Sequence, residues 1–155
     1  MRKSYAVWIV LFFGIAILAW ILAGGVGMYL DLPSVAVVIV IPIPLLLSVF
    51  SGADIRTAFS AVYRNDPSDA ELRTAVLVFR TWERLILLGG LFGVISGAIA
   101  IFSNISGNTE MIGKGLALAL LSPLYAMILT MALTIPFHAA ARRKLVDSPR
   151  PIQDI

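Results

Sequence analysis

The chain alternates between long apolar runs and short charged segments. Four runs contain no Asp, Glu, Lys or Arg, and they cover residues 5–30, 32–53, 85–109 and 115–141. At about 1.5 Å of rise per residue, each run can cross a hydrocarbon layer of roughly 30 Å as one helix. The pattern therefore predicts an all-α membrane protein, one domain over residues 1–155, with four transmembrane helices. We expect these helices at about 5–30, 33–53, 84–104 and 112–141.

The charged segments between the runs carry helix signals of their own. Ser68-Asp69-Ala70-Glu71 has the pattern of a capping box, so a new helix is expected to start there and to run through Trp82 into the third span. Together with a helical continuation after the second span, this predicts a short cytoplasmic helical hairpin over residues 54–83. Pro42 and Pro44 should break the second span, since proline removes a helix donor. Residues 146–155 are expected to form a loose tail.

Composition supports the membrane interpretation and excludes several classes of function. Apolar residues make up 59%, charged residues 14%, and the mean hydropathy is +0.94, whereas a soluble domain has about 25% charged residues. Little of the chain is left for a soluble domain, so we expect neither an enzyme nor a cofactor. The chain has no Cys, which removes disulfides and thiolate chemistry, and no metal site is expected. The pI near 9.6 does not indicate nucleic-acid binding, because the basic residues stand at helix ends, where lipid headgroups account for them.

The placement of basic residues predicts the orientation. With four spans, 11 of the 12 Lys and Arg residues fall on one side of the membrane, and Lys114 alone falls on the other. The others are Arg2, Lys3, Arg56, Arg64, Arg73, Arg80, Arg84, Arg142, Arg143, Lys144 and Arg150. By the positive-inside rule, both termini and the middle loop are cytoplasmic. The first apolar run is too long for the core of a signal peptide, so we expect it to stay as the first span.

Small residues recur at helical spacing in the last two spans. In the third span Gly89, Gly93 and Gly97 are four residues apart, and Gly90 adds a second row. Such a face lets another helix approach closely, and it predicts a tight interface between copies of the chain; ordinary glycine enrichment in membrane helices is the alternative. A second stripe in the fourth span could line a pore or contact a central helix. It consists of Gly115, Ala119, Ser122, Ala126, Thr130 and Thr134. The alternative for its hydroxyls is a bond to their own helix carbonyls.

Charged side chains are absent from the centres of the expected spans. The chain by itself thus offers no proton carrier and no counter-ion for a cation. His138 is the one titratable candidate, and its place near the basic cluster favours an interfacial role over a proton relay. Asp31 and Glu110 are expected at the outer boundary, in contact with water.

Three segments resemble one known family. Asp31 to Val40, leading to Ser48-Val49-Phe50, resembles the second membrane helix of the flagellar stator protein MotA. Gly90 to Gly97 looks like the third-helix pattern shared by MotA, TolQ and ExbB. Ile112 to Ala126, followed by Pro136 and Arg142 to Leu145, is similar to their fourth helix.

The resemblance implies a subunit of an ion-driven motor or energy-transducing complex in the bacterial inner membrane. Such proteins form a pentamer around a dimer of a single-span partner of the MotB, ExbD or TolR type, and the partner's Asp carries the ion. The implied pore-lining or partner-facing residues are Ser96, Ser122, Pro123, Ala126, Thr130 and Thr134. The implied packing residues are Gly89, Gly90, Gly93, Gly97, Gly115 and Ala119, and Pro136 matches the family's helix proline.

The chain also departs from the family pattern. The usual threonines fall on Pro123 and Val94, and Leu87 stands where MotA opens its third helix with proline. The cytoplasmic insert is short, which weighs against flagellar torque. Two alternatives stay open at this point: a non-conducting structural scaffold subunit, and a small stand-alone transporter.

Overall fold

The computed structural model describes residues 5–103 and 109–147, and every element within these ranges is helical. The elements are α1 (Tyr5–Leu22), η1 (Val26–Tyr29), α2 (Leu32–Ile39), α3 (Pro42–Val49), α4 (Gly52–Tyr63), α5 (Asp69–Ser103), α6 (Thr109–Leu129), η2 (Thr130–Thr134) and α7 (Ile135–Asp147). η1 is a 3-10 turn and η2 is a π-turn. The all-α prediction is confirmed for this part of the chain.

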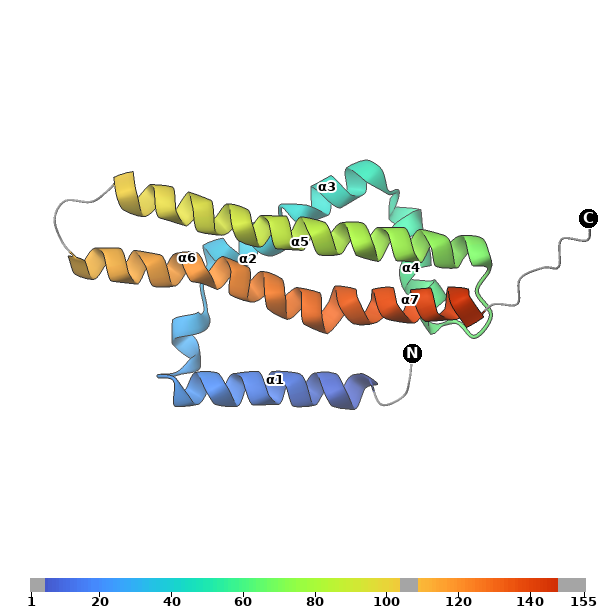
Figure 1. The fold of residues 1–155 in the computed structure, drawn as a ribbon, viewed down its shortest axis with the longest axis horizontal. Coiled ribbons are helices and arrows are strands. Elements are labelled where there is room, and N and C mark those ends of the chain that lie inside the picture. Colours follow the sequence, from blue (N-terminus) through green and yellow to red (C-terminus); the bar gives the residue numbers. More distant parts are fainter. Residues whose placement is uncertain (1–4, 104–108, 148–155) are drawn as a thin grey trace, which may run out of the picture.

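Two long helices form the axis of the molecule. α5 runs beside the continuous helix made by α6, η2 and α7, while α2, α3 and α4 pack on this pair (Figure 1). The 35 residues of α5 make a rod of about 52 Å, so it extends about 20 Å beyond a hydrocarbon layer of roughly 30 Å. α5 therefore contains both a stretch that can span the membrane and part of the charged segment outside it.

Several local predictions are confirmed. α5 starts at the expected capping box, in which the Glu71 backbone N–H donates to Ser68 Oγ at 3.3 Å and the Ser68 N–H donates to Glu71 Oε2 at 2.8 Å. It then runs without a break through Trp82 to Ser103. The expected break at Pro42 is the boundary between α2 and α3.

The first and last spans differ from the expectation. α1 ends at Leu22 rather than near residue 30, because Gly24 and Gly25 take φ values of 122° and 108°, a region that only glycine adopts readily. The fourth span is divided by η2, and its helix continues to Asp147, so residues 146 and 147 of the expected tail are helical. Residues 148–155 of that tail lie outside the described residues.

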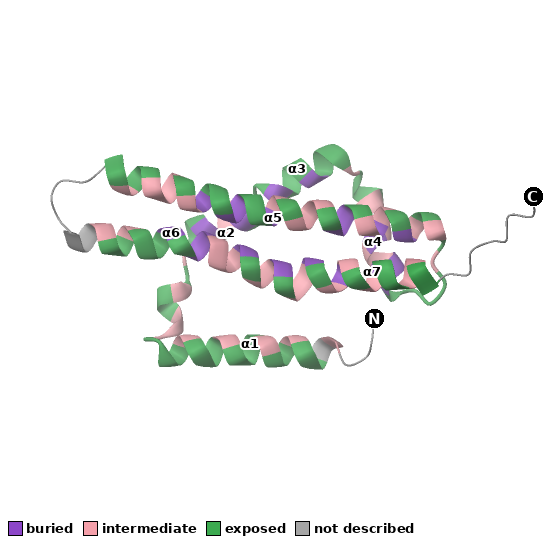
Figure 2. Ribbon diagram, viewed as in Figure 1, coloured by how far each residue is buried: buried purple, intermediate pink, exposed green. Residues whose placement is uncertain are grey.

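Three helical stretches are long and apolar enough to cross a membrane: Leu32–Val49, Asp69–Ser103 and Ile112–Asp147. The apolar helix Val7–Leu22 is shorter. Among the described residues, three of the four predicted spans are therefore long enough to cross a membrane, and α1 is a shorter apolar helix. Among the described side chains of α1 none is buried, and the helix stands apart from the buried centre (Figure 2).

The buried core has its centre at the charged end of the molecule. There Phe137 of α7 meets four other rings, with centroid distances of 5.3 Å to Phe79, 5.4 Å to Phe59, 5.8 Å to Tyr63 and 6.1 Å to Tyr5. These contacts join α1, α4, α5 and α7. We refer to these five rings as the aromatic cluster.

Replacing Phe137 with Ala is expected to lower the free energy of unfolding by about 3–5 kcal/mol, because a side chain that is 4% exposed leaves a large cavity. Chemical unfolding in detergent micelles measures this loss. Phe13 of α1, which is 39% exposed, provides the matched control, and its replacement with Ala should have a much smaller effect. Equal losses would show that the aromatic cluster is not the core.

Hydrogen bonds from Lys144 fasten α7 to the end of α4. Its Nζ donates to the carbonyls of Ala61 at 3.1 Å, Val62 at 2.9 Å and Arg64. These are carbonyls of the last turn and C-cap of α4, where a cation is favoured by the helix dipole. Partial burial lowers the pKa of the Lys144 ammonium. The contact fixes the hairpin helix α4 to the C-terminal helix.

On the other side of the hairpin, Arg64 forms an ion pair with Glu71 at 2.9 Å. The Ser68 backbone hydrogen bond, helped by the Ser68 hydroxyl and Arg64, lowers the pKa of the Glu71 carboxyl. The turn between α4 and α5 is therefore held by a carboxylate that is charged at neutral pH.

The predicted orientation can be tested directly, because the natural chain has no Cys. Single Cys residues at positions 68, 106 and 148 replace serines. In intact spheroplasts, a membrane-impermeant thiol reagent should label only the Cys at position 106, since the positive-inside rule places the other two in the cytoplasm. Labelling at position 68 would contradict the predicted orientation, because it would place the middle loop outside the cytoplasm.

Candidate functional site

Among the described helices, α5 and α6 share the most extensive contact, and their backbones approach closely. A Cβ atom at Gly93 would lie 2.3 Å from Ser122 Oγ, one at Gly90 would lie 2.7 Å from Ala126 Cβ, and one at Gly97 would lie 2.7 Å from Ala119 Cβ. Real Cβ atoms do not approach so closely, so these glycines are required for the contact. Each of these three glycines meets a small residue of α6.

The remaining predicted packing glycines lie at the two edges of this contact. Gly89 faces α2 and the start of α3, where an added Cβ would lie 3.2 Å from the Val37 carbonyl oxygen and 3.6 Å from Pro42 Cγ. Gly115 faces Ile101 of α5, with an added Cβ 2.6 Å from Ile101 Cγ1. The sequence analysis expected the third-span glycines to join copies of the chain. In the structure their face is occupied by α6 and α2 of the same chain.

The predicted pore-facing residues lie mostly on the same closed contact. The buried members are Ser122, Ala126, Thr130 and Thr134, and the half-buried members are Ser96 and Pro123. In the single chain α5 covers this stripe, as the purple band between α5 and α6 in Figure 2 illustrates. Their role in a pore stays a prediction.

The hydroxyl groups of the stripe differ in their hydrogen bonds. Thr134 Oγ1 donates to the Thr130 carbonyl at 3.3 Å, which is the local bond considered as the alternative in the sequence analysis. Thr130 Oγ1 is buried and, in the described part of the chain, has no hydrogen-bond partner. Burial of an unpaired hydroxyl lowers the folding stability by about 1–3 kcal/mol, so selection for stability alone would not favour Thr at position 130.

The π-turn η2 lies directly before Pro136. The Ile135 N–H donates to the Thr130 carbonyl, five residues back. Proline has no N–H, and its ring clashes with the carbonyl four residues back in a regular helix. The wider turn relieves this clash at Ala132, whose carbonyl accepts a hydrogen bond from the Tyr5 hydroxyl instead. π-turns of this kind occur often at functional sites.

Asp31 takes part in a hydrogen-bond chain that joins the start of α2 to α6. Its backbone N–H donates to the Tyr125 hydroxyl at 3.1 Å, and that hydroxyl donates to the Tyr29 carbonyl. The carboxylate Oδ2 accepts the Ser34 N–H at 2.9 Å and caps α2. Asp31 is therefore half-buried and hydrogen-bonded, directly before the candidate span Leu32–Val49. Its place at the outer boundary stays a prediction. Glu110 has no described side chain.

Sequence reasoning missed Tyr5, Tyr125 and Lys144. The hydroxyl groups of the two tyrosines join segments more than 90 residues apart, which no local pattern reveals. Pro136 was a usable signal, because a proline in a helix predicts a free carbonyl at Ala132. Groups of three or more His, Cys, Asp or Glu side chains that could hold a metal ion do not occur among the described residues.

The helices from α4 to α7 also carry a family match. A model of the MotA/TolQ/ExbB proton channel family matches residues 54–149, more than half of the chain. The chain belongs to the MotA/TolQ/ExbB proton channel family. A search among curated proteins gave no match.

Membership of the MotA/TolQ/ExbB family confirms the resemblance noted in the third and fourth spans. The matched range begins at Asp54, so the resemblance of Asp31 to Phe50 lies outside it. The family is one of proton-channel and energy-transduction subunits, not an enzyme family. Together with the long apolar helices, it makes this chain a membrane protein of the proton-channel motor type.

Proposed function

We propose that several copies of this chain, most simply five, form a ring in the bacterial inner membrane around two spans of a partner protein. The partner is a single-span protein of the MotB, ExbD or TolR type, and a carboxylate in its span carries the ion. Ion flow through this assembly drives a mechanical or transport load. Both termini of the chain face the cytoplasm.

The observation that carries the proposal is the combination of the family match with charge-free spans. A proton needs a titratable stop to cross a low-dielectric layer, and the apolar runs offer no Asp, Glu, Lys or Arg. The carboxylate next to the second apolar run, Asp31, already caps a helix. A carrier from a second polypeptide fits these facts.

The packing of the chain fits a subunit that surrounds an ion path rather than a subunit that carries the ion. The close contact of α5 and α6 fixes two helices as one unit, and the outward faces of both helices are rich in large apolar side chains, among them Leu91, Ile95, Leu116 and Leu120. These faces suit lipid and neighbouring copies. A rigid unit with apolar flanks is what a ring around a moving centre requires.

Purification in a mild detergent tests the proposal. Native mass spectrometry of the material should give a ring of identical chains with two copies of a single-span protein that has an ionisable residue within its span. Recovery of the chain as a monomer, or as a ring with no second polypeptide, would contradict the proposal.

A second candidate is a scaffold subunit of the same architecture that conducts nothing. It is favoured by the closed hydroxyl stripe, because Ser122 and Thr134 are buried against the chain itself, and by Pro123 and Val94 at the family's threonine positions. The two candidates differ in ion conduction by the purified complex.

A further inference from the structure

The turn before Pro136 is joined to the N-terminal helix by one polar contact. Because Pro136 cannot donate to the Ala132 carbonyl, this oxygen is left without its helical partner. The Tyr5 hydroxyl of α1 donates to it. The bond joins two residues 127 positions apart in the chain.

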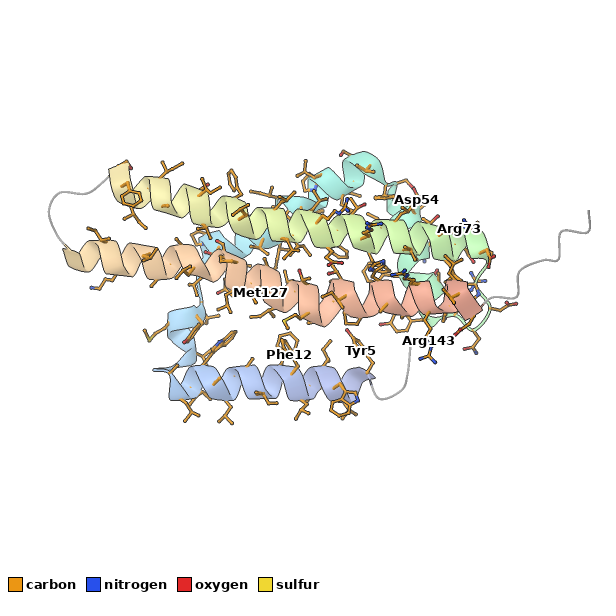
Figure 3. All side chains as sticks on the ribbon, in the orientation of Figure 1. Tyr5, Phe12, Asp54, Arg73, Met127 and Arg143 are labelled. Carbon is orange, nitrogen blue, oxygen red and sulfur yellow. The ribbon has the colours of Figure 1, made fainter. Side chains whose placement is uncertain are left out.

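Few other contacts attach α1 to the rest of the molecule. At its N-terminal end the Tyr5 ring meets the edge of Phe137 with centroids 6.1 Å apart. At its other end Trp20 stacks on Tyr29 at 5.0 Å, within the segment that follows the helix. Between these ends the helix lies apart from α6, with Phe12 directed across the space towards it (Figure 3). None of the described side chains of α1 is buried.

The chain after α1 has the features of a hinge. Gly24 and Gly25 both have positive φ values, and a Cβ at Gly25 would meet nothing within 4 Å. Two such glycines in sequence allow large changes of direction at little conformational cost.

We propose that α1 is a latched arm, which the Tyr5 hydroxyl holds on the free Ala132 carbonyl and which swings on Gly24 and Gly25 when this bond opens. The physical basis is the membrane environment. An apolar helix that leaves the protein for lipid pays no hydrophobic penalty, so packing and polar contacts decide its position. Among its described residues α1 has no buried side chain, and the latch is a polar contact between this helix and the bundle.

The latch connects the arm to the cytoplasmic half of the protein. Phe137 is the neighbour of Pro136 and the centre of the aromatic cluster, which holds α4, α5 and α7 together. Opening of the latch releases a carbonyl and a ring contact at this point. A change in the position of α1 is thereby transmitted to the hairpin helices.

Distance measurements between two spin labels test the latch in the full-length protein in lipid nanodiscs. The natural chain has no Cys, so Cys residues can be placed at Val10 on α1 and Met127 on α6, both exposed. The natural sequence at the latch should give one short distance. Tyr5→Phe keeps the ring and removes the hydroxyl, and it should add a longer distance, with the ratio of latched to open arm reduced about fivefold.

A second variant separates the latch from simple packing of the Tyr5 ring. Pro136→Ala restores an N–H that can donate to the Ala132 carbonyl and so compete with Tyr5. It should open the arm to a similar extent, and the double variant should open it no further. Tyr63→Phe is the matched control, since its ring also contacts Phe137 at 5.8 Å and its hydroxyl lies near that of Tyr5, whereas the hydrogen bond to the Ala132 carbonyl comes from Tyr5.

Each result decides the proposal. An unchanged distance in Tyr5→Phe overturns it, whatever the behaviour of Pro136→Ala. Additive opening in the double variant also overturns it, because two groups that act on one carbonyl cannot act independently. Opening in Tyr63→Phe would assign the effect to the aromatic cluster instead of the hydroxyl.

Discussion

Liposomes that contain this chain alone are expected to hold an imposed proton gradient, and liposomes that also contain its partner are expected to conduct. A proton that crosses ~30 Å of apolar interior needs a titratable group on the way. The apolar runs supply none of the four charged residue types. A pH-sensitive dye inside the vesicles, with a potassium diffusion potential across the membrane, measures the flux.

Within the conducting complex, Ser122→Ala should reduce the flux about fivefold, if its hydroxyl provides a hydrogen bond worth about 1 kcal/mol to the ion path. The variant keeps Cβ and therefore the contact with Gly93. Leu118→Ala is the control on the same helix, because Leu118 is 50% exposed and faces outward. A larger loss at Leu118 than at Ser122 would remove the hydroxyl stripe from the ion path.

Asp31→Asn identifies which polypeptide carries the proton. Asparagine caps a helix about as well as aspartate does, so the Ser34 contact and the fold should persist while the titratable group is lost. The flux of the complex should be unchanged. A conducting chain without partner, or a complex silenced by Asp31→Asn, would place the carrier in this chain and would refute the proposed mechanism.

The sequence predicted α5 better than any other element because its signals are local. A capping box marks its first turn, and an uninterrupted apolar run follows. α1 was predicted too long, since apolarity alone does not show where Gly24 and Gly25 turn the chain. The apolar run indicates which residues can lie in lipid, whereas the conformation of Gly24 and Gly25 decides where α1 ends.

The small residues of the candidate site were visible in the sequence, but their partners were not. Spacing shows that Gly90, Gly93 and Gly97 share a face, yet it does not show whether α6 of the same chain or another copy covers that face. Asp31 illustrates a similar gap. Its place between two apolar runs indicated a boundary, but no local pattern showed its long-range bond to Tyr125.

Replacing Gly93 with Ala tests the close contact of Gly93 with Ser122. Gly93→Ala should lower the free energy of unfolding by about 1–3 kcal/mol, since overpacking of a close contact forces the helices apart. Even the first added carbon would stand 2.3 Å from Ser122 Oγ. Gly93→Leu should be worse. Chemical unfolding in detergent micelles measures both variants.

Two further variants make the Gly93 experiment decisive. Gly113→Ala is the control, because a Cβ there meets nothing within 4 Å, and it should be neutral or slightly stabilising. Ser122→Gly removes the obstructing atoms, so Gly93→Ala should be less harmful in that background than in the natural sequence.

If Gly93→Ala instead leaves the stability of the single chain intact and only reduces the mass of the oligomer, the glycine face meets another copy, as the sequence first indicated. Rescue by Ser122→Gly would show that it meets α6.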